Sequence, residues 1–363
     1  MKAFNLFIKK YNIYLLLACI ILLQTVCLTV SFANNKKGYH SDELWSYGFA
    51  CSSEGMNVFS ERDGQTPKNF DKWVSSSVLH DYITIDKSET FDYVSVYQNS
   101  ADDYHPFLYF ILLHFICSIF PGTFSMWYAY VINIIFFIIQ QIFLFKLIRS
   151  LTGNSHWGII GTFFFGLTTG SENILFFLRM YCPATALSVV LFYYLTELYN
   201  KRNDSKISKS LFIKLFTTTL AGCLMLHEFI ILAFIAALLY GLYYLFTKHV
   251  KYAFIFGGTM ISSALLSIGI FPSTIQHLFG STGTFGGHVK KYSFMFQFKI
   301  YWSYITNELF GIATSPWHTM TSVYVFYAII IFLFLFIPFC FIFRHEKWLH
   351  TFFKKLKNGF LQF

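Results

Sequence analysis

Residues 11–33, YNIYLLLACIILLQTVCLTVSFA, decide the fold class of this chain. The stretch is long enough to cross a membrane, because a hydrocarbon core about 30 Å thick needs about 20 apolar residues. The basic residues Lys2, Lys9 and Lys10 precede it, as they would in a signal peptide. However, its apolar part is longer than the roughly 7–15 residues of a signal core. We therefore interpret it as a retained first membrane helix.

The rest of the chain repeats this apolar character. Of the 363 residues, 55% are hydrophobic and only 12% are charged, which is too apolar for a soluble protein of this length. Most of the 7 Cys lie within apolar stretches, and no CxxC pair indicates a zinc or redox site. The sequence predicts an all-α polytopic membrane protein. Its further apolar stretches lie at 105–120, 126–148, 157–177, 182–199, 211–227, 229–247, 253–271 and 322–343.

The basic residues predict how these stretches cross the membrane. Cytoplasmic loops collect Lys and Arg, and every basic cluster falls on the side of the N-terminus if 105–120 does not cross. That stretch is short and is bounded by Pro106 and Pro121, which suits a helix in the membrane interface. About eight transmembrane helices result. One side then holds 17 Lys and Arg with 3 acids, and the other holds 10 with 15 acids.

This topology defines three regions. Residues 1–271 form a transmembrane module that includes a large extracytoplasmic loop with interfacial helices at 34–125. Residues 272–321 form a second extracytoplasmic loop, and 322–363 form the last transmembrane helix and a basic tail. We expect an integral protein of the bacterial cytoplasmic membrane with both termini in the cytoplasm. The net charge of +9 is explained by topology and by contact with anionic membrane lipids, and not by nucleic-acid binding.

Two adjacent carboxylates follow the first span directly, in the sequence His40-Ser41-Asp42-Glu43. Charge beside a bilayer is costly and is retained where it has a role. Asp42 and Glu43 are therefore candidates for acid/base catalysis at the membrane surface. The structural alternative is that Ser41 or Asp42 only caps a helix.

Further polar groups lie on the same predicted side and suit the binding of an anionic substrate. Arg matches phosphate oxygens with two parallel hydrogen bonds, and Lys with backbone amides can surround an anion. Helix capping, contact with lipid headgroups and ordinary polar turns are the alternatives. No group of residues has an established metal-ligand spacing, and Asp102, Asp103 and His105 are a possible set of ligands for a divalent metal. The candidate substrate-binding residues are Asp102, Asp103, Tyr104, His105, Arg179, Tyr181, His227, Glu228, His288, Lys290 and Lys291.

The order of these features over about residues 1–250 resembles the GT-C superfamily of membrane glycosyltransferases. The most similar groups are the protein O-mannosyltransferases and the lipid A aminoarabinose transferases. The chain has His105-Pro106-Phe107-Leu108-Tyr109 where such enzymes commonly have His-Pro-Pro-Leu-Tyr. It departs from their pattern at Phe107, at Phe177 where an acid is common, and at Glu228 where an aromatic residue is common. It also has fewer predicted spans.

The resemblance implies transfer of a sugar from a polyprenyl-phosphate donor to a glycan, lipid or protein acceptor in the cell envelope. In that scheme Asp42 is the general base, Glu43 is its companion, and Arg179, His105 and the Lys290/Lys291 loop stabilise the departing phosphate. Two other functions remain open. One is a polysaccharide polymerase or a flippase-type protein, and the other is a non-catalytic subunit with a GT-C-like fold.

Overall fold

The computed structural model describes residues 2–58, 73–103, 105–202, 207–247, 249–279 and 296. The chain divides into two compact units, residues 1–311 and 312–363, and the described residues belong to the first. Every regular element among them is helical. These elements are α1 (Lys2–Asn35), α2 (Ser41–Cys51), the 3-10 turn η1 (Gly55–Val58), α3 (Ser76–Ile83), α4 (Tyr93–Asp102), α5 (Leu108–Ile119), α6 (Met126–Thr152), α7 (Ser155–Phe165), α8 (Thr169–Phe176), α9 (Tyr181–Asn200), α10 (Lys209–Met225), α11 (Phe229–Phe246), α12 (Val250–Ile270) and α13 (Ser273–Phe279).

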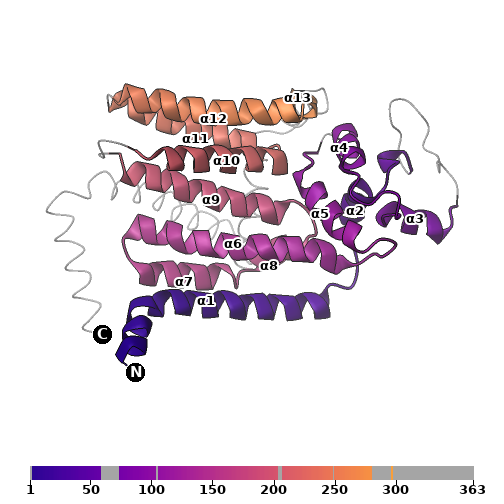
Figure 1. Cartoon of the computed structure of the whole chain (residues 1–363), viewed down its shortest axis with the longest axis horizontal. Coiled ribbons are helices and arrows are strands. Elements are labelled where there is room, and N and C mark those ends of the chain that lie inside the picture. The colour runs from indigo at the N-terminus through magenta and orange to yellow at the C-terminus, as the bar shows by residue number, and fades with distance from the viewer. Residues whose placement is uncertain are drawn as a thin grey trace. The chain divides into compact units, whose positions relative to one another are not determined.

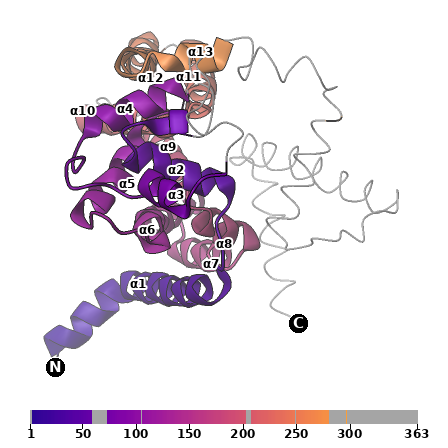
Figure 2. The same cartoon turned by 90° about the vertical axis from the view of Figure 1, so that its right-hand side faces the viewer.

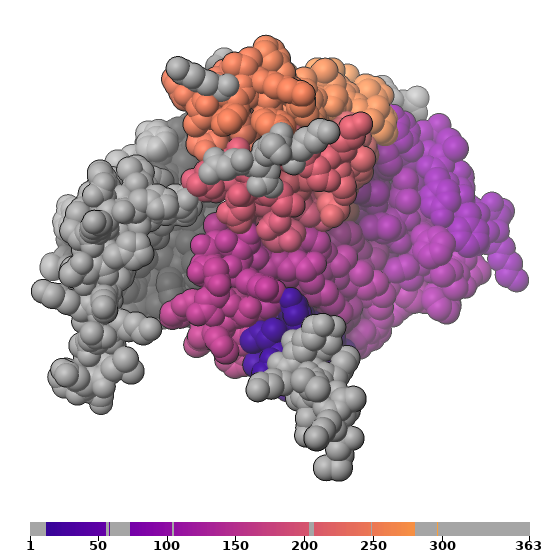
Figure 3. All heavy atoms as spheres, turned by 60° about the vertical axis from the view of Figure 1, so that its left-hand side comes forward, coloured from indigo at the N-terminus to yellow at the C-terminus, as the bar shows by residue number. Residues whose placement is uncertain are grey.

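The long helices of this unit lie side by side. Helix α6 packs against α7 and α9, α10 packs against α9 and α12, and α11 packs against α12 (Figure 1). Helices α2 to α5 gather at one end of these long helices (Figures 1 and 2). We call this the α2–α5 end. It also contains the C-terminal end of α1, the start of α9, the α10–α11 turn and α13. Figure 3 turns the opposite end toward the viewer.

Four described helices are long and apolar enough to cross a membrane, which confirms a helical membrane protein. They are Asn12–Asn35, Met126–Thr152, Phe229–Phe246 and Val250–Ile270. The expected count of eight is therefore too high for the described residues. The predicted span 322–343 lies outside them.

Three of the predicted spans correspond to helices that are too short or not apolar enough to be counted, for identifiable reasons. The predicted span 157–177 is broken into α7 and α8, and α10 has only 17 residues. Helix α9 has 20 residues but falls short in apolarity. At the break, the Gln24 side-chain amide donates hydrogen bonds to the carbonyls of Thr162 at 3.1 Å and Phe163 at 2.9 Å. A Cβ at Gly166 would lie 2.3 Å from Gln24 Nε2, so a larger residue at this position would displace the Gln24 amide.

The stretch predicted not to cross, 105–120, forms α5. This helix has 12 residues and packs against α2 and α4. At about 1.5 Å per residue it is too short to cross a hydrocarbon core. Its length therefore fits the interfacial placement that the basic residues predicted.

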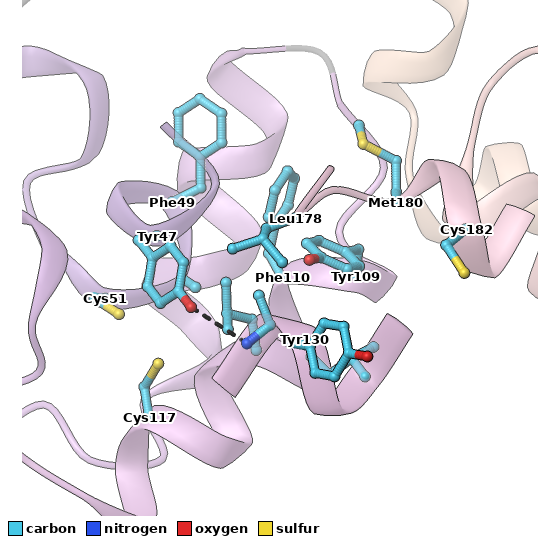
Figure 4. Close-up of a cluster of buried hydrophobic side chains, with 14 of the residues drawn as sticks. Tyr47, Phe49, Cys51, Tyr109, Phe110, Cys117, Tyr130, Leu178, Met180 and Cys182 are labelled. Carbon is cyan, nitrogen blue, oxygen red and sulfur yellow. Dashed lines mark hydrogen bonds between the residues drawn. The ribbon is translucent and has the colours of Figure 1, made fainter. Parts of the chain in front are cut away.

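A buried core holds α2 and α5 against the ends of the long helices (Figure 4). The Tyr47 hydroxyl donates to the Ser125 carbonyl at 2.7 Å and accepts from the Ala129 amide at 3.2 Å, which fixes α2 to the start of α6. Leu178 and Met180 are both fully buried in this core. The core therefore fixes the short segment between α8 and α9 on both sides of position 179.

Candidate functional site

The first turn of α2 carries both predicted carboxylates. His40 is the N-cap, and its Nδ1 accepts a hydrogen bond from the Asp42 amide at 3.1 Å. Glu43 closes a capping box, because its Oε2 accepts from the His40 amide at 2.8 Å. The start of a helix carries a partial positive charge, so it favours both carboxylates. The cap is thus His40, and neither Ser41 nor Asp42 fills that position.

Glu43 is fully buried and fully engaged. Lys36 Nζ, at the end of α1, lies 2.6 Å from Oε1 and 2.8 Å from Oε2. The Leu178 amide donates to Oε1 at 2.9 Å, in addition to the His40 amide on Oε2. One carboxylate therefore ties the end of α1, the start of α2 and the α8–α9 segment together. With its lone pairs occupied, Glu43 is suited to positioning its neighbours.

Asp42 presents a different environment. Its side chain is 40% exposed, and its Oδ2 lies 2.6 Å from NH1 of Arg179, a side chain that is only 6% exposed. The other oxygen, Oδ1, lies 3.5 Å from both Ser41 Oγ and His40 Nδ1. The result is a solvent-accessible carboxylate that a nearly buried guanidinium holds in place. Arg179 Nε is buried and has no hydrogen-bond partner among the described residues.

A pocket of about 380 Å³ lies between residues of α8 and the start of α9, next to the segment that carries Arg179. It is lined by Asn173, Ile174, Phe177 and Tyr181. The rings of Phe177 and Tyr181 stack with centroids 5.7 Å apart, and the Arg179 guanidinium carbon lies 6.0 Å from the Tyr181 ring. The pocket therefore offers an aromatic wall beside a carboxylate and a cation.

A second polar cluster forms around three histidines. His105 Nδ1 forms a hydrogen bond with the Asp103 carboxylate, at the junction of α4 and α5. The His277 ring, from α13, lies 6.2 Å from that of His105 and stacks on that of His227 at 4.4 Å. Burial lowers the pKa of His277, and the nearby His105 lowers it further. The carboxylates of Glu228 and Asp103 act in the opposite direction and raise this pKa. His277 is therefore neutral near pH 7.

The structure brings most of the predicted site residues together in these two groups. Asp42, Glu43, Arg179 and Tyr181 form the first, and Asp103, His105, His227 and Glu228 form the second. Asp102 is the last residue of α4. Tyr104, His288, Lys290 and Lys291 lie outside the described residues.

Sequence reasoning did not select Lys36, His40 or His277 for the site. Lys36 and His40 bracket the turn into α2, so a basic residue close to the acidic pair was an available signal. His277 gave no such signal. It reaches the cluster because α12 ends at Ile270 and α13 starts within the same end of the bundle.

Within the described part of the chain, no group of three or more His, Cys, Asp or Glu side chains is arranged to hold a metal ion. The geometry therefore gives no support to a divalent metal at Asp102, Asp103 and His105. No protein-family model, curated protein or solved structure matches this chain. The resemblance to the GT-C superfamily consequently rests on the order of its motifs.

Proposed function

We propose that the α2–α5 end is the active site of a glycosyltransferase that uses a polyprenyl-phosphate sugar as donor. The observation that supports it is the pairing of accessible Asp42 with nearly buried Arg179 beside an aromatic-walled pocket. Transfer from a lipid phosphate requires a base for the acceptor and a cation for the leaving group. These are the two groups that meet here, from segments far apart in the sequence.

In the proposed reaction, an acceptor hydroxyl attacks the anomeric carbon of the sugar in one inverting step. The new bond joins the acceptor oxygen to that carbon, and the bond from the carbon to the phosphate oxygen breaks. The hydroxyl proton passes to Asp42, and the phosphate leaves with the electron pair. Arg179 uses NH1 for Asp42, so in this proposal its other terminal nitrogen binds the phosphate.

The other polar residues take supporting roles in this proposal. Glu43 positions Asp42 and Arg179, because it accepts hydrogen bonds from the backbone amides of His40, two residues before Asp42, and of Leu178, directly before Arg179. Tyr181 and Phe177 form a face for the sugar ring. The cluster of His105, His227 and Glu228 contacts the acceptor, which is a glycan, lipid or protein of the cell envelope.

We also propose that the α2–α5 end faces the outside of the cell. Among the described residues, acids gather at this end, whereas Arg149, Lys201 and Lys251 lie at the ends of helices on the opposite side. A tag inserted near Gly122 is then accessible only from outside, and labelling from the cytoplasm contradicts this orientation.

The catalytic proposal is tested with Asp42→Asn. Purified protein in lipid is given polyprenyl-phosphate sugars together with extracted envelope lipids and glycans, and sugar transfer is measured. Loss of a general base lowers the rate by about 100-fold or more. Asp81→Asn, at an exposed acid of α3, is the control and retains wild-type transfer. If Asp42→Asn transfers sugar as fast as the wild type, the proposal is wrong.

One observation favours a second candidate, a flippase-type transporter. Transporters place broken helices and buried polar groups within the membrane, and the break between α7 and α8 is such a feature. Gln24 and Gln141 are nearly fully buried around it, and no hydrogen bond engages Gln141 Oε1 or Nε2 among the described residues. In a transport assay with a fluorescent polyprenyl-linked sugar, this function predicts that Gln141→Leu slows movement across the bilayer while Asp42→Asn does not.

A further inference from the structure

A second pocket lies at the end of the bundle opposite the Asp42–Arg179 pair, the end that Figure 3 turns toward the viewer. Three helices form it: α6, α9 and α10. Its volume is about 180 Å³, so it is small. The charged residues and serines that line it are Lys146, Lys201, Lys214, Glu197, Ser208 and Ser210, beside Tyr193 and Tyr194.

The charges of this pocket do not balance. Among the described lining residues there are three lysines and one carboxylate, which leaves an excess of two positive charges (three minus one). Glu197 accepts a hydrogen bond from Ser150 Oγ at 3.0 Å, and no carboxylate lies within 4.0 Å of the three lysines among the described residues. Lys146 instead lies over the Phe143 ring at 4.6 Å. Within the described part of the chain, the three lysines thus line one pocket without an anionic partner.

Helix α10 adds to the positive potential. Its N-cap Ser208 and its second residue Ser210 both line the pocket, so the helix starts there. The Ser208 side chain accepts from the Ser210 amide at 3.3 Å. The start of a helix favours anions, and here it lies beside three ammonium groups. A basic pocket between membrane helices, near the membrane surface, is an arrangement that binds phosphate headgroups.

We propose that this pocket binds a phosphate group, supplied by the headgroup of an anionic phospholipid or by free phosphate in solution. The volume admits a headgroup phosphate and is below the range of about 300–1,000 Å³ for drug-sized ligands. Exposed apolar side chains at Phe192 and Ile213 neighbour the lining residues in sequence and offer contacts for acyl chains. Anchoring α6, α9 and α10 to one headgroup fixes these helices at the membrane surface.

The test uses the full-length protein in nanodiscs of phosphatidylcholine. Binding of added phosphatidylglycerol, of glycerol phosphate and of inorganic phosphate is measured by native mass spectrometry and by the shift in melting temperature. The variant Lys146→Gln/Lys214→Gln removes two charges from the pocket. The control Lys209→Gln/Lys251→Gln removes two charges from the same end outside the pocket lining. Melting without added ligand shows that both variants are folded.

We expect the pocket variant to weaken phosphatidylglycerol binding by at least about tenfold and the control to change it by less than about twofold. Phosphatidylglycerol binding that phosphate does not match identifies the lipid as the source. Binding of inorganic phosphate with the same lysine dependence identifies the soluble anion. Equal weakening in both variants shows a general charge effect and overturns the proposal, as does the absence of binding by all three probes.

Discussion

The substitution Glu43→Gln tests how the site is held together. Gln has the shape of Glu but no charge, and one of its two terminal atoms is a donor. The donor end would face Lys36 Nζ and one of the two backbone amides that now bind the carboxylate. One backbone hydrogen bond and the ion pair with Lys36 are therefore lost in a fully buried location. Breaking one side of such a buried pair costs about 3–5 kcal/mol.

The measurement is the free energy of unfolding of the purified protein in mild detergent, with sugar transfer followed in parallel. Glu172→Gln is the matched control, because within the described residues the Glu172 side chain accepts one hydrogen bond, from Ser31 Oγ at 2.6 Å, which the Gln oxygen can also accept. We expect a loss of about 3–5 kcal/mol for Glu43→Gln and about 1 kcal/mol or less for the control. Equal losses in the two variants would refute the assignment of Glu43 as the residue that joins the three segments.

Two other perturbations follow from the packing. Gly48→Ala should lower the free energy of unfolding by about 1–3 kcal/mol, because the new Cβ would lie 1.8 Å from the buried ring of Tyr82. The control is Gly257→Ala, where nothing lies within 4 Å of the new Cβ, so the free energy of unfolding should stay unchanged or rise. Thermal melts of the two variants measure the difference. Burial holds the pKa of His277 in the folded protein below its usual value of 6.5, so the unfolded chain binds a proton more readily and stability falls as the pH drops below that value. His277→Gln removes this contribution, so its melting temperature should fall less than that of the wild type between pH 7.5 and 5.5, and an identical fall in both would contradict the reasoning.

The apolar sequence predicted those elements whose form depends on local composition. Helices α1, α6, α11 and α12 each coincide with a long apolar run, and the short run at 105–120 became α5. The division of 157–177 was not predicted, because it depends on a contact with a residue of α1. Gln24 binds the carbonyls of Thr162 and Phe163 in the last turn of α7, and composition within 157–177 carries no information about that side chain.

In the candidate site, too, the sequence predicted what depends on neighbouring residues and not what depends on contacts between distant parts of the chain. The acidic pair was identifiable because charge beside an apolar span is unusual. Its two environments were not, since they come from Lys36, Leu178 and Arg179, two of which are more than a hundred residues away. Tertiary packing therefore separates Asp42, which is accessible, from Glu43, which is buried.

The backbone hydrogen bond from Leu178 to Glu43 also constrains the order in which the protein is assembled. The two residues are 135 positions apart, so the carboxylate is synthesised well before its partner. A charged group lacking one of its donors is costly to bury, so it stays hydrated until residues 177–180 arrive. During biosynthesis, the end of α1 and the start of α2 therefore reach their final packing only after the segment that contains Arg179 has been synthesised. A nascent chain that stops before α9 would hold a correct first helix and an incomplete site.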